Sequence, residues 1–485
     1  MKRIILLALL LAGTAMNTMA RDGYHIQVKI PGVKDSMVYL AHYYGLPLPK
    51  IYKSDSARFD KNGVAVIKSD KELLGGIYVI LLSDMSTLFE VLLNNGDEFN
   101  VSVKSKSDIP VGLTFKNSPE NDRFMEYQKF LRDYGEKYEA LKKSAETAKN
   151  HADTMAIDKK MKALSKTLQD YRHDYTQQYP RTILASVFNA LDEPVVPEGK
   201  HYLPDGKEDS TFAYHYFKDH YWDKFDFTDD RLINTPLYDG KLDQYINKMV
   251  VPIPDSIEKE ADMLLAKTRG SKELFHYTLW YLEYNAEHSK IMGMDAAVVY
   301  LIEKYYMKGD AYWLHDTDLQ KYIKYASKIA PNVIGNKAPE IKLVDINNVE
   351  HRLSDIKAKY TLLVFWSPEC GHCQHEIPVL DSVYKAVLKP KGVKVMAIKT
   401  EGDEKKWKEF IEKNDLKDWI HVYDPANKSD YRAKYDIYST PVLYLLDENK
   451  IIRGKRIDHT NIANVLEMVE KKEKADKEKQ KKKTY

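Results

Sequence analysis

The spacing of hydrophobic residues changes along the chain and divides it into segments of different structure. From Tyr24 to Phe115, apolar and polar residues alternate in short runs such as YHIQVKI and MVYLAHYY, which glycine and asparagine turn signals separate. Alternation of this kind predicts β-strands with one buried face. We therefore expect residues 21–115 to form an all-β domain, either a small sandwich or a barrel.

Helical spacing follows this β-rich segment. Ser118 and Pro119 match the N-cap and the first position of a helix. Aromatic residues and leucines then recur three and four residues apart on both sides of a polar break at 150–153, which predicts an antiparallel pair of amphipathic helices. The tyrosines of these stripes are typical of packing, although they would also suit a surface for aromatic or sugar ligands. Further helical patterns predict one mostly all-α domain over 116–330.

Strand and helix patterns alternate in the last part of the chain. A buried strand is expected at Thr361–Trp366, a helix from Gly371 to Leu388, and a hairpin turned at Asp447–Lys450. The order βαβ followed by ββα predicts an α/β domain over 331–470. The lysine-rich tail, 471–485, is typical of a solvated helix end.

Residues 1–20 have the order of a secretory signal peptide: two basic residues, the apolar run Ile4–Ala12, and then small residues. Cleavage is expected after Ala20, with Ala15 as the competing position. An uncleaved membrane anchor is the alternative, but the apolar run is shorter than the roughly 20 residues that span a bilayer. The segment contains no cysteine, which excludes a lipoprotein anchor. The sequence thus predicts an exported protein of the periplasm or cell envelope.

Cysteine usage and charge narrow the possible functions. Cys370 and Cys373 are the only cysteines among 485 residues. A disulfide across two intervening residues closes almost no loop and therefore stabilises little. A structural zinc site draws its ligands from two separated segments, and the sequence has no second cysteine pair, so we expect no metal. The net charge of +2 offers no electrostatic basis for binding nucleic acid.

The position of the two cysteines indicates redox chemistry. Cys370 falls between an expected strand and an expected helix, where free backbone N–H groups and the helix dipole lower the pKa of a thiol. Cys373 follows one turn later, within reach of a mixed disulfide formed at Cys370. An exposed attacking thiol and a sheltered resolving thiol are what thiol–disulfide exchange requires. We expect no cofactor other than the redox-active Cys370–Cys373 disulfide.

The residues around this pair resemble a known family. Trp366, the CxxC motif, Glu376 and Thr440–Pro441 follow the pattern of thioredoxin-fold oxidoreductases. Ala338–Pro339, together with the ExP motif at Glu376–Pro378, is similar to exported bacterial proteins of the TlpA/ResA type. The resemblance covers about 331–470. The preceding residues, 21–330, resemble the extensions of unknown function found before such domains in exported Bacteroidota proteins.

The resemblance implies a C-terminal thioredoxin fold and a role for each matching residue. Cys370 is the expected nucleophile and Cys373 the resolving thiol. Pro441 is expected to be a cis-proline that faces the cysteines. Thr440 would offer backbone hydrogen bonds to the substrate chain. Trp366 would shield the active-site face where substrate binds, although packing alone would also account for a tryptophan at this position.

Two departures from the family pattern change the expected chemistry. Val364 stands where cytosolic-type thioredoxins carry a buried aspartate. A proton relay must therefore use another group, and Glu376 is the candidate, with a surface glutamate as the competing interpretation. The dipeptide between the cysteines is Gly371–His372, as in protein disulfide isomerases. His372 is expected to stabilise the Cys370 thiolate and raise the reduction potential of the cysteine pair. The competing interpretation is an exposed loop side chain. The redox direction of the protein therefore stays open.

The predicted function is disulfide exchange with protein substrates by an exported oxidoreductase, in the reductase or the isomerase direction. A membrane redox partner would recycle the cysteine pair. One alternative is a binding or scaffold protein that acts through residues 21–330 and carries the redox domain as an accessory. Another alternative is a peroxidase, which the close second cysteine disfavours. The predicted fold class is multidomain: an all-β sandwich or barrel, an all-α domain and an α/β thioredoxin fold.

Overall fold

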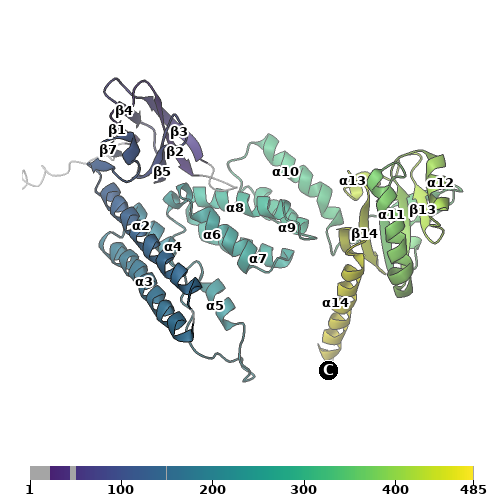
Figure 1. The fold of residues 1–485 in the computed structure, drawn as a ribbon. Coiled ribbons are helices and arrows are strands. Elements are labelled where there is room, and N and C mark those ends of the chain that lie inside the picture. Colours follow the sequence, from purple (N-terminus) through teal and green to yellow (C-terminus); the bar gives the residue numbers. More distant parts are fainter. Residues whose placement is uncertain (1–21, 44–50, 149, 484–485) are drawn as a thin grey trace, which may run out of the picture. The chain divides into compact units, whose positions relative to one another are not determined.

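The computed structural model describes residues 22–43, 51–148 and 150–483 (Figure 1). The expected signal peptide lies outside these residues. Contacts divide the chain into two compact units, residues 1–249 with 266–277, and residues 250–265 with 278–485. This division passes through the helical region, and the domain boundaries expected from the sequence stay predictions.

The first unit begins with two four-stranded sheets, with strand orders β4-β1-β7-β8 and β3-β2-β5-β6. Buried side chains of both sheets share one core, among them Ile26 of β1, Leu40 of β2 and Ile80 of β5. The expected β-sandwich is therefore confirmed. Its strands are β1 (Tyr24–Lys29), β2 (Met37–Tyr43), β3 (Ile51–Arg58), β4 (Val64–Ser69), β5 (Gly76–Leu82), β6 (Leu88–Leu93), β7 (Asp97–Ser102) and β8 (Thr114–Lys116).

Helices complete the first unit, and the expected antiparallel pair is α2 (Pro119–Glu146) with α3 (His151–Gln178) (Figure 1). Pro119 begins α2 as predicted. The Ser118 side chain, however, makes no capping hydrogen bond and accepts one from the Asn121 side chain at 2.8 Å. Three shorter helices follow: α4 (Ile183–Leu191), α5 (Phe212–His220) and α6 (Tyr238–Gln244).

Four α-helices of the described residues lie wholly or partly in the second unit, ahead of its sheet. They are α7 (Pro254–Lys267), α8 (Lys272–Glu287), α9 (Asp295–Leu301) and α10 (Asp316–Ile329). Two of these helices are divided between the units. The second unit contains α7 up to Leu265 and α8 from Thr278 onward. The all-α character expected for the middle of the chain is confirmed by these helices and by those of the first unit.

A seven-stranded mixed sheet with the order β10-β9-β13-β12-β11-β14-β15 forms the rest of the second unit. Its strands are β9 (Lys342–Asp345), β10 (Glu350–Arg352), β11 (Tyr360–Trp366), β12 (Val393–Lys399), β13 (Ile420–Tyr423), β14 (Val442–Asp447) and β15 (Ile452–Ile457). The helices that accompany it are α11 (Gly371–Val383), α12 (Glu404–Lys413), α13 (Tyr431–Lys434) and α14 (Ile462–Lys483). Strands and helices therefore alternate as the sequence predicted.

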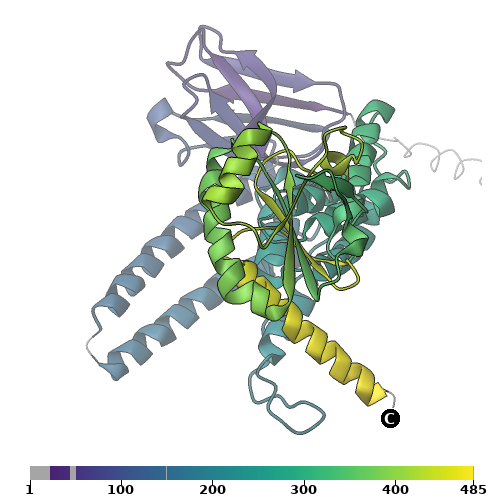
Figure 2. The same cartoon turned by 90° about the vertical axis from the view of Figure 1, so that its right-hand side faces the viewer.

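Strand β11 lies inside this sheet, between the parallel strand β12 and the antiparallel strand β14. Every residue of β11 is buried, because helices and loops cover both faces of the sheet. Leu362, Val364 and Trp366 face a core to which α11, α12 and α14 contribute, and Figure 2 shows helices beside the strands. A strand buried on both faces needs a continuous apolar run, which is what the sequence TLLVFW provides.

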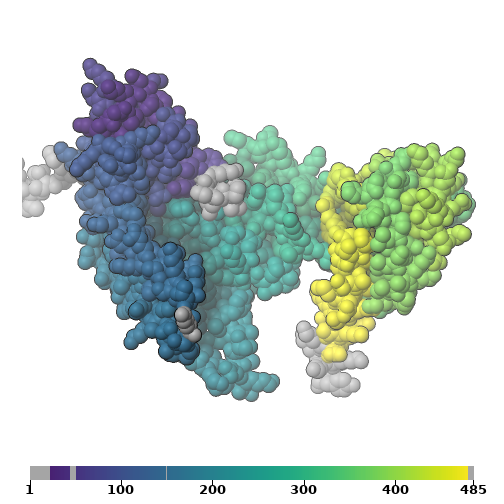
Figure 3. All heavy atoms as spheres, viewed as in Figure 1, coloured from purple at the N-terminus to yellow at the C-terminus, as the bar shows by residue number. Residues whose placement is uncertain are grey.

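The last helix, α14, packs its first turns on this core through Ile462 and Leu466. It then continues through the lysine-rich segment as far as Lys483, and its surface appears in yellow in Figure 3. Within the ranges that the structure describes, we found no helix with the length and apolarity needed to cross a membrane.

Candidate redox site

The two cysteines lie where β11 ends and α11 begins. Cys370 is the N-cap residue of α11, with φ −78° and ψ 120°. Its Sγ accepts a hydrogen bond from the backbone N–H of Cys373, at an N–S distance of 3.5 Å. The thiol therefore occupies the place of a capping side chain, where the unpaired N–H groups of the first helical turn favour negative charge. This is the position that the sequence predicted for it.

The two thiols have opposite electrostatic environments. Partial burial opposes ionisation of Cys370, but the Thr440 side chain and the N–H groups of Cys373 and His372 outweigh it, so the pKa of the Cys370 thiol is lowered. Cys373 is fully buried, and burial raises the pKa of its thiol to about 12. Both thiols are free in this structure. Cys370 is thus the thiol that ionises more readily, and Cys373 is the sheltered thiol.

The loop before β14 faces Cys370. The Thr440–Pro441 peptide bond is cis, as predicted for this position. The Cys370 thiol donates a hydrogen bond to the Thr440 carbonyl oxygen, at 3.3 Å. The protonated Cys370 thiol therefore uses the Thr440 carbonyl oxygen as its hydrogen-bond acceptor. When the thiol loses its proton, this oxygen is free to accept a hydrogen bond from another chain.

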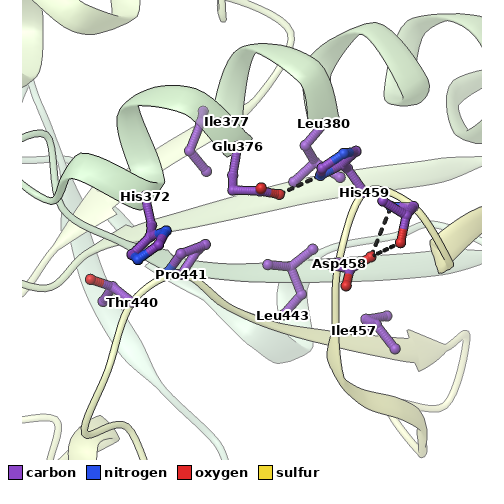
Figure 4. A pocket seen from close by; sticks show the side chains of 11 residues that line it. His372, Glu376, Ile377, Leu380, Thr440, Pro441, Leu443, Ile457, Asp458 and His459 are labelled. Atoms are coloured by element: carbon purple, nitrogen blue, oxygen red, sulfur yellow. Dashed lines mark hydrogen bonds and ion pairs between the residues drawn. The ribbon is translucent and has the colours of Figure 1, made fainter.

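A pocket of about 310 Å³ opens beside the cysteine helix (Figure 4). His372, Thr440 and Pro441 lie at one end of it and His459 at the other. Glu376 projects from α11 and forms a hydrogen bond and ion pair with Nδ1 of His459. Apolar side chains complete the wall, namely Ile377, Leu380, Leu443 and Ile457. The pocket combines an apolar surface with a carboxylate–imidazole pair near the two thiols.

Comparison with known proteins gives the family of this domain. Residues 334–455 match the family model described as AhpC/TSA family. The thioredoxin-like protein YneN of Bacillus subtilis (strain 168) is 30% identical over 133 residues, which are 27% of this chain and 76% of that protein. The chain belongs to the thioredoxin-like family of thiol–disulfide oxidoreductases.

Other matches cover the same domain, and two family models match the preceding residues. The thiol-disulfide oxidoreductase ResA of Geobacillus kaustophilus (strain HTA426) is 28% identical over 128 residues, covering 26% of this chain and 71% of that protein. A crystal structure of a domain of a possible thiol-disulfide isomerase from Cytophaga hutchinsonii is 41% identical, covering 30% of this chain and 99% of that one, with a TM-score of 0.28. Two models of domains of unknown function, DUF4369 and DUF5106, match residues 24–124 and 203–332.

Trp366 takes a different place in the thioredoxin-like domain from the one expected. Its side chain is 0% exposed and packs against Phe410, with ring centroids 5.1 Å apart. The ring has no exposed surface to offer to a substrate, and its burial agrees with the competing interpretation, that Trp366 is a packing residue. Trp366 instead supports the cysteine loop from inside the core. Val364 is likewise buried in that core and brings no titratable group to the pair.

His372 is exposed and lines the pocket, but no contact joins its ring to a cysteine in the described residues. The contribution of His372 to the lowered pKa of Cys370 comes from its backbone N–H, and it is smaller than those of Thr440 and Cys373. Tuning by the His372 side chain stays a prediction. Also within the described ranges, no group of three or more His, Cys, Asp and Glu side chains could hold a metal ion.

Sequence reasoning did not find His459. It lies in the loop between β15 and α14, 83 residues from its partner Glu376. A histidine between aspartate and threonine just before the last helix carries no motif of its own. Only the fold of the thioredoxin-like domain, which brings α11 beside this loop, makes the pair visible.

The contrast between the thiols predicts selective alkylation of the reduced protein. Iodoacetamide should modify Cys370 with a pH midpoint below the value of about 8.5 for a free cysteine, because its thiolate is stabilised. Cys373 should stay unmodified in the folded protein and react after denaturation. Peptide mass spectrometry after timed alkylation between pH 5 and 9 measures both rates. Equal labelling of the two thiols at neutral pH would contradict the assignment of attacker and resolver.

Proposed function

We propose that this protein exchanges disulfides with protein substrates through the Cys370–Cys373 pair, after export to the periplasm or cell envelope. The observation that carries the proposal is the asymmetry of the pair. One thiol is partly exposed with a lowered pKa, and the other, one helical turn away, is buried with a raised pKa. The ResA relatives, named thiol-disulfide oxidoreductases, support the same chemistry.

In the reducing direction, the Cys370 thiolate attacks one sulfur of a substrate disulfide. A mixed disulfide forms between Cys370 and the substrate, and the other substrate sulfur leaves as a thiolate that takes up a proton. Cys373 then loses its proton and attacks the Cys370 sulfur. The substrate leaves with two thiols, and Cys370 and Cys373 remain as a disulfide. A membrane dithiol donor would return two electrons to it, whereas an isomerase would resolve the mixed disulfide within the substrate.

The second step needs a group that accepts the proton of Cys373, because the pKa of this buried thiol is raised to about 12. Glu376 is one turn after Cys373, lines the adjacent pocket and is held by His459. A carboxylate within reach of a transferred proton, directly or through one water, can act as a general base. We therefore assign Glu376 as the proton acceptor and His459 as the residue that positions it.

Replacing His459 with glutamine should slow the resolution of the mixed disulfide by about tenfold or more, since general bases contribute about 10²-fold or more and here the base is displaced, not removed. The pH profile of this step should change, while the rate of initial attack by Cys370 stays the same. Stopped-flow measurement with a fluorescent peptide disulfide separates the two steps. The matched control is His351→Gln, which breaks another histidine–carboxylate pair, with Asp345, outside the pocket. An unchanged pH profile in His459→Gln would remove His459 from the mechanism.

The function itself is tested by reduction of insulin and by the equilibrium potential of the pair in a glutathione buffer. A potential near about −270 mV would assign a reductant, and one between about −180 and −120 mV an isomerase or oxidant. Failure of the pair to form a reversible disulfide at any glutathione ratio would contradict the proposal.

A further inference from the structure

A second pocket, of about 480 Å³, lies between two helices of the second unit, ahead of the thioredoxin-like sheet. Trp280, Glu283, Tyr284 and Glu287 recur at three-and-four spacing and form one face of α8. Tyr322 and Tyr325 line the pocket from α10. The pocket therefore has a wall of aromatic rings and carboxylates, and the redox mechanism uses none of these residues.

Glu283 is the unusual member of this wall. Its exposed fraction is 4%, yet it has no hydrogen bond and no ion pair with any residue in the part of the chain that the structure describes. Burial, and then the nearby Glu287, raise the pKa of its carboxyl to about 7. A buried carboxylate without a partner is costly unless a cation or a hydrogen-bond donor approaches it. Its side chain lines this pocket.

The aromatic rings around Glu283 are half-buried, so each keeps part of its surface for a ligand. Trp280 and Tyr284 stack with ring centroids 5.4 Å apart. Tyr322 is supported from behind by Tyr306, at 4.7 Å between centroids. The electron-rich faces of tryptophan and tyrosine attract cations, most strongly where water is excluded.

The charges of the pocket favour a cation over a neutral or anionic ligand. Three carboxylates line it, and its single lysine, Lys321, is already paired with Asp318 at 2.7 Å. The one ion-pair contact of Glu287 within the described residues is a long one to His288, at 4.0 Å. Glu283 and Glu287 thus remain to balance a bound positive charge.

We propose that the pocket between α8 and α10 binds an organic cation of the alkylammonium class. The ammonium group lies against Glu283, and its methyl or methylene groups lie on the faces of Trp280, Tyr284, Tyr322 and Tyr325. The aromatic rings supply the apolar contact and the cation–π attraction, and the buried carboxylate supplies the counter-charge. This binding is separate from the disulfide chemistry of Cys370 and Cys373.

Isothermal titration of the full-length protein tests the proposal with choline and its neutral isostere, 3,3-dimethylbutanol. Choline should bind at least about tenfold more tightly than the alcohol, because only choline gains the cation–π and ionic terms. Glu283→Gln and, separately, Trp280→Leu should each weaken choline binding by about tenfold. Glu303→Gln, which removes an exposed carboxylate of the same unit outside the pocket, should leave it unchanged.

The outcomes separate the ligand classes. Equal binding of choline and 3,3-dimethylbutanol would show that the pocket is only apolar. Preferential binding of methyl glucoside would show a sugar site. Either result overturns the proposal, and so does the absence of choline binding. Loss of binding in both pocket variants with Glu303→Gln intact supports it. The Cys370→Ser variant should bind choline normally, so the result does not depend on the redox function.

Discussion

Replacing Cys370 with serine is expected to lower the rate of disulfide exchange by about a thousandfold or more, because a serine hydroxyl is not ionised at neutral pH and does not attack a disulfide sulfur. The thiol sits at the N-terminus of α11 with the N–H of Cys373 directed at its sulfur, and no other thiol is accessible to replace it. Insulin reduction with a dithiol donor measures the loss.

Cys373→Ser is expected to give a different result from Cys370→Ser. The nucleophile remains, so the first step proceeds, but the mixed disulfide has no resolving thiol and accumulates. Non-reducing electrophoresis and mass spectrometry of the conjugate detect it. The matched control is the Cys370→Ser, Cys373→Ser double variant, which should form no conjugate. Normal turnover by Cys373→Ser, or conjugates formed by the double variant, would show that disulfide exchange does not run through this pair.

Asp295→Ala is expected to destabilise the second unit by about 3 kcal/mol, the usual range for breaking a buried ion pair. Lys455 lies on β15 with 5% of its surface exposed. Its ammonium group contacts the Asp295 carboxylate at the start of α9 and the Asn332 side chain, the latter at 2.6 Å. Removing the carboxylate leaves a buried charge without its counter-ion. Urea unfolding followed by tryptophan fluorescence reports on this unit, because Trp222 is the only tryptophan outside it.

The pH dependence of the stability loss in Asp295→Ala follows from the pKa of the Lys455 amine. Burial lowers the pKa of Lys455, against the attraction of Asp295. Between the folded and the unfolded pKa, the unfolded chain binds the proton that the folded chain releases, so stability rises with pH in that alkaline range. Without Asp295 the folded pKa falls further, and the destabilisation should shrink as the pH rises.

Two control variants isolate the buried pair. Replacing both partners, as in Asp295→Leu with Lys455→Met, should recover most of the stability, because neither charge is then buried. Glu350→Ala removes one partner of the exposed pair with Lys342, 2.5 Å apart, and should cost much less stability than Asp295→Ala, because solvent screens this pair. A loss in Asp295→Ala no larger than that of Glu350→Ala would show that this contact does not stabilise the unit.

Local patterns were enough to predict much of this protein. The apolar run of β11, the start of α11 and the pair Cys370–Cys373 between them depend on neighbouring residues, and each was found where expected. The alternation of the N-terminal strands predicted their buried faces in the same way. The cis bond before Pro441 was implied by family resemblance, and the structure contains it.

Other features depend on which side chains meet across the fold. Trp366 was expected at the active-site face, but the helices packed on β11 enclose it completely. The partner of Glu376 is 83 residues away, and that of Lys455 is 160 residues away. Neither separation leaves a periodic signal in the sequence.

The amino-acid sequence by itself determined where the strands and helices form and which thiol caps a helix, because periodicity, capping and chain spacing act over a few residues. Only the tertiary structure decided how deeply Cys373 and Trp366 are buried, that His459 holds Glu376, and that Glu283 faces a pocket without a partner in the described residues. These properties arise from desolvation and from contacts between distant segments, and both exist only once the helices have packed.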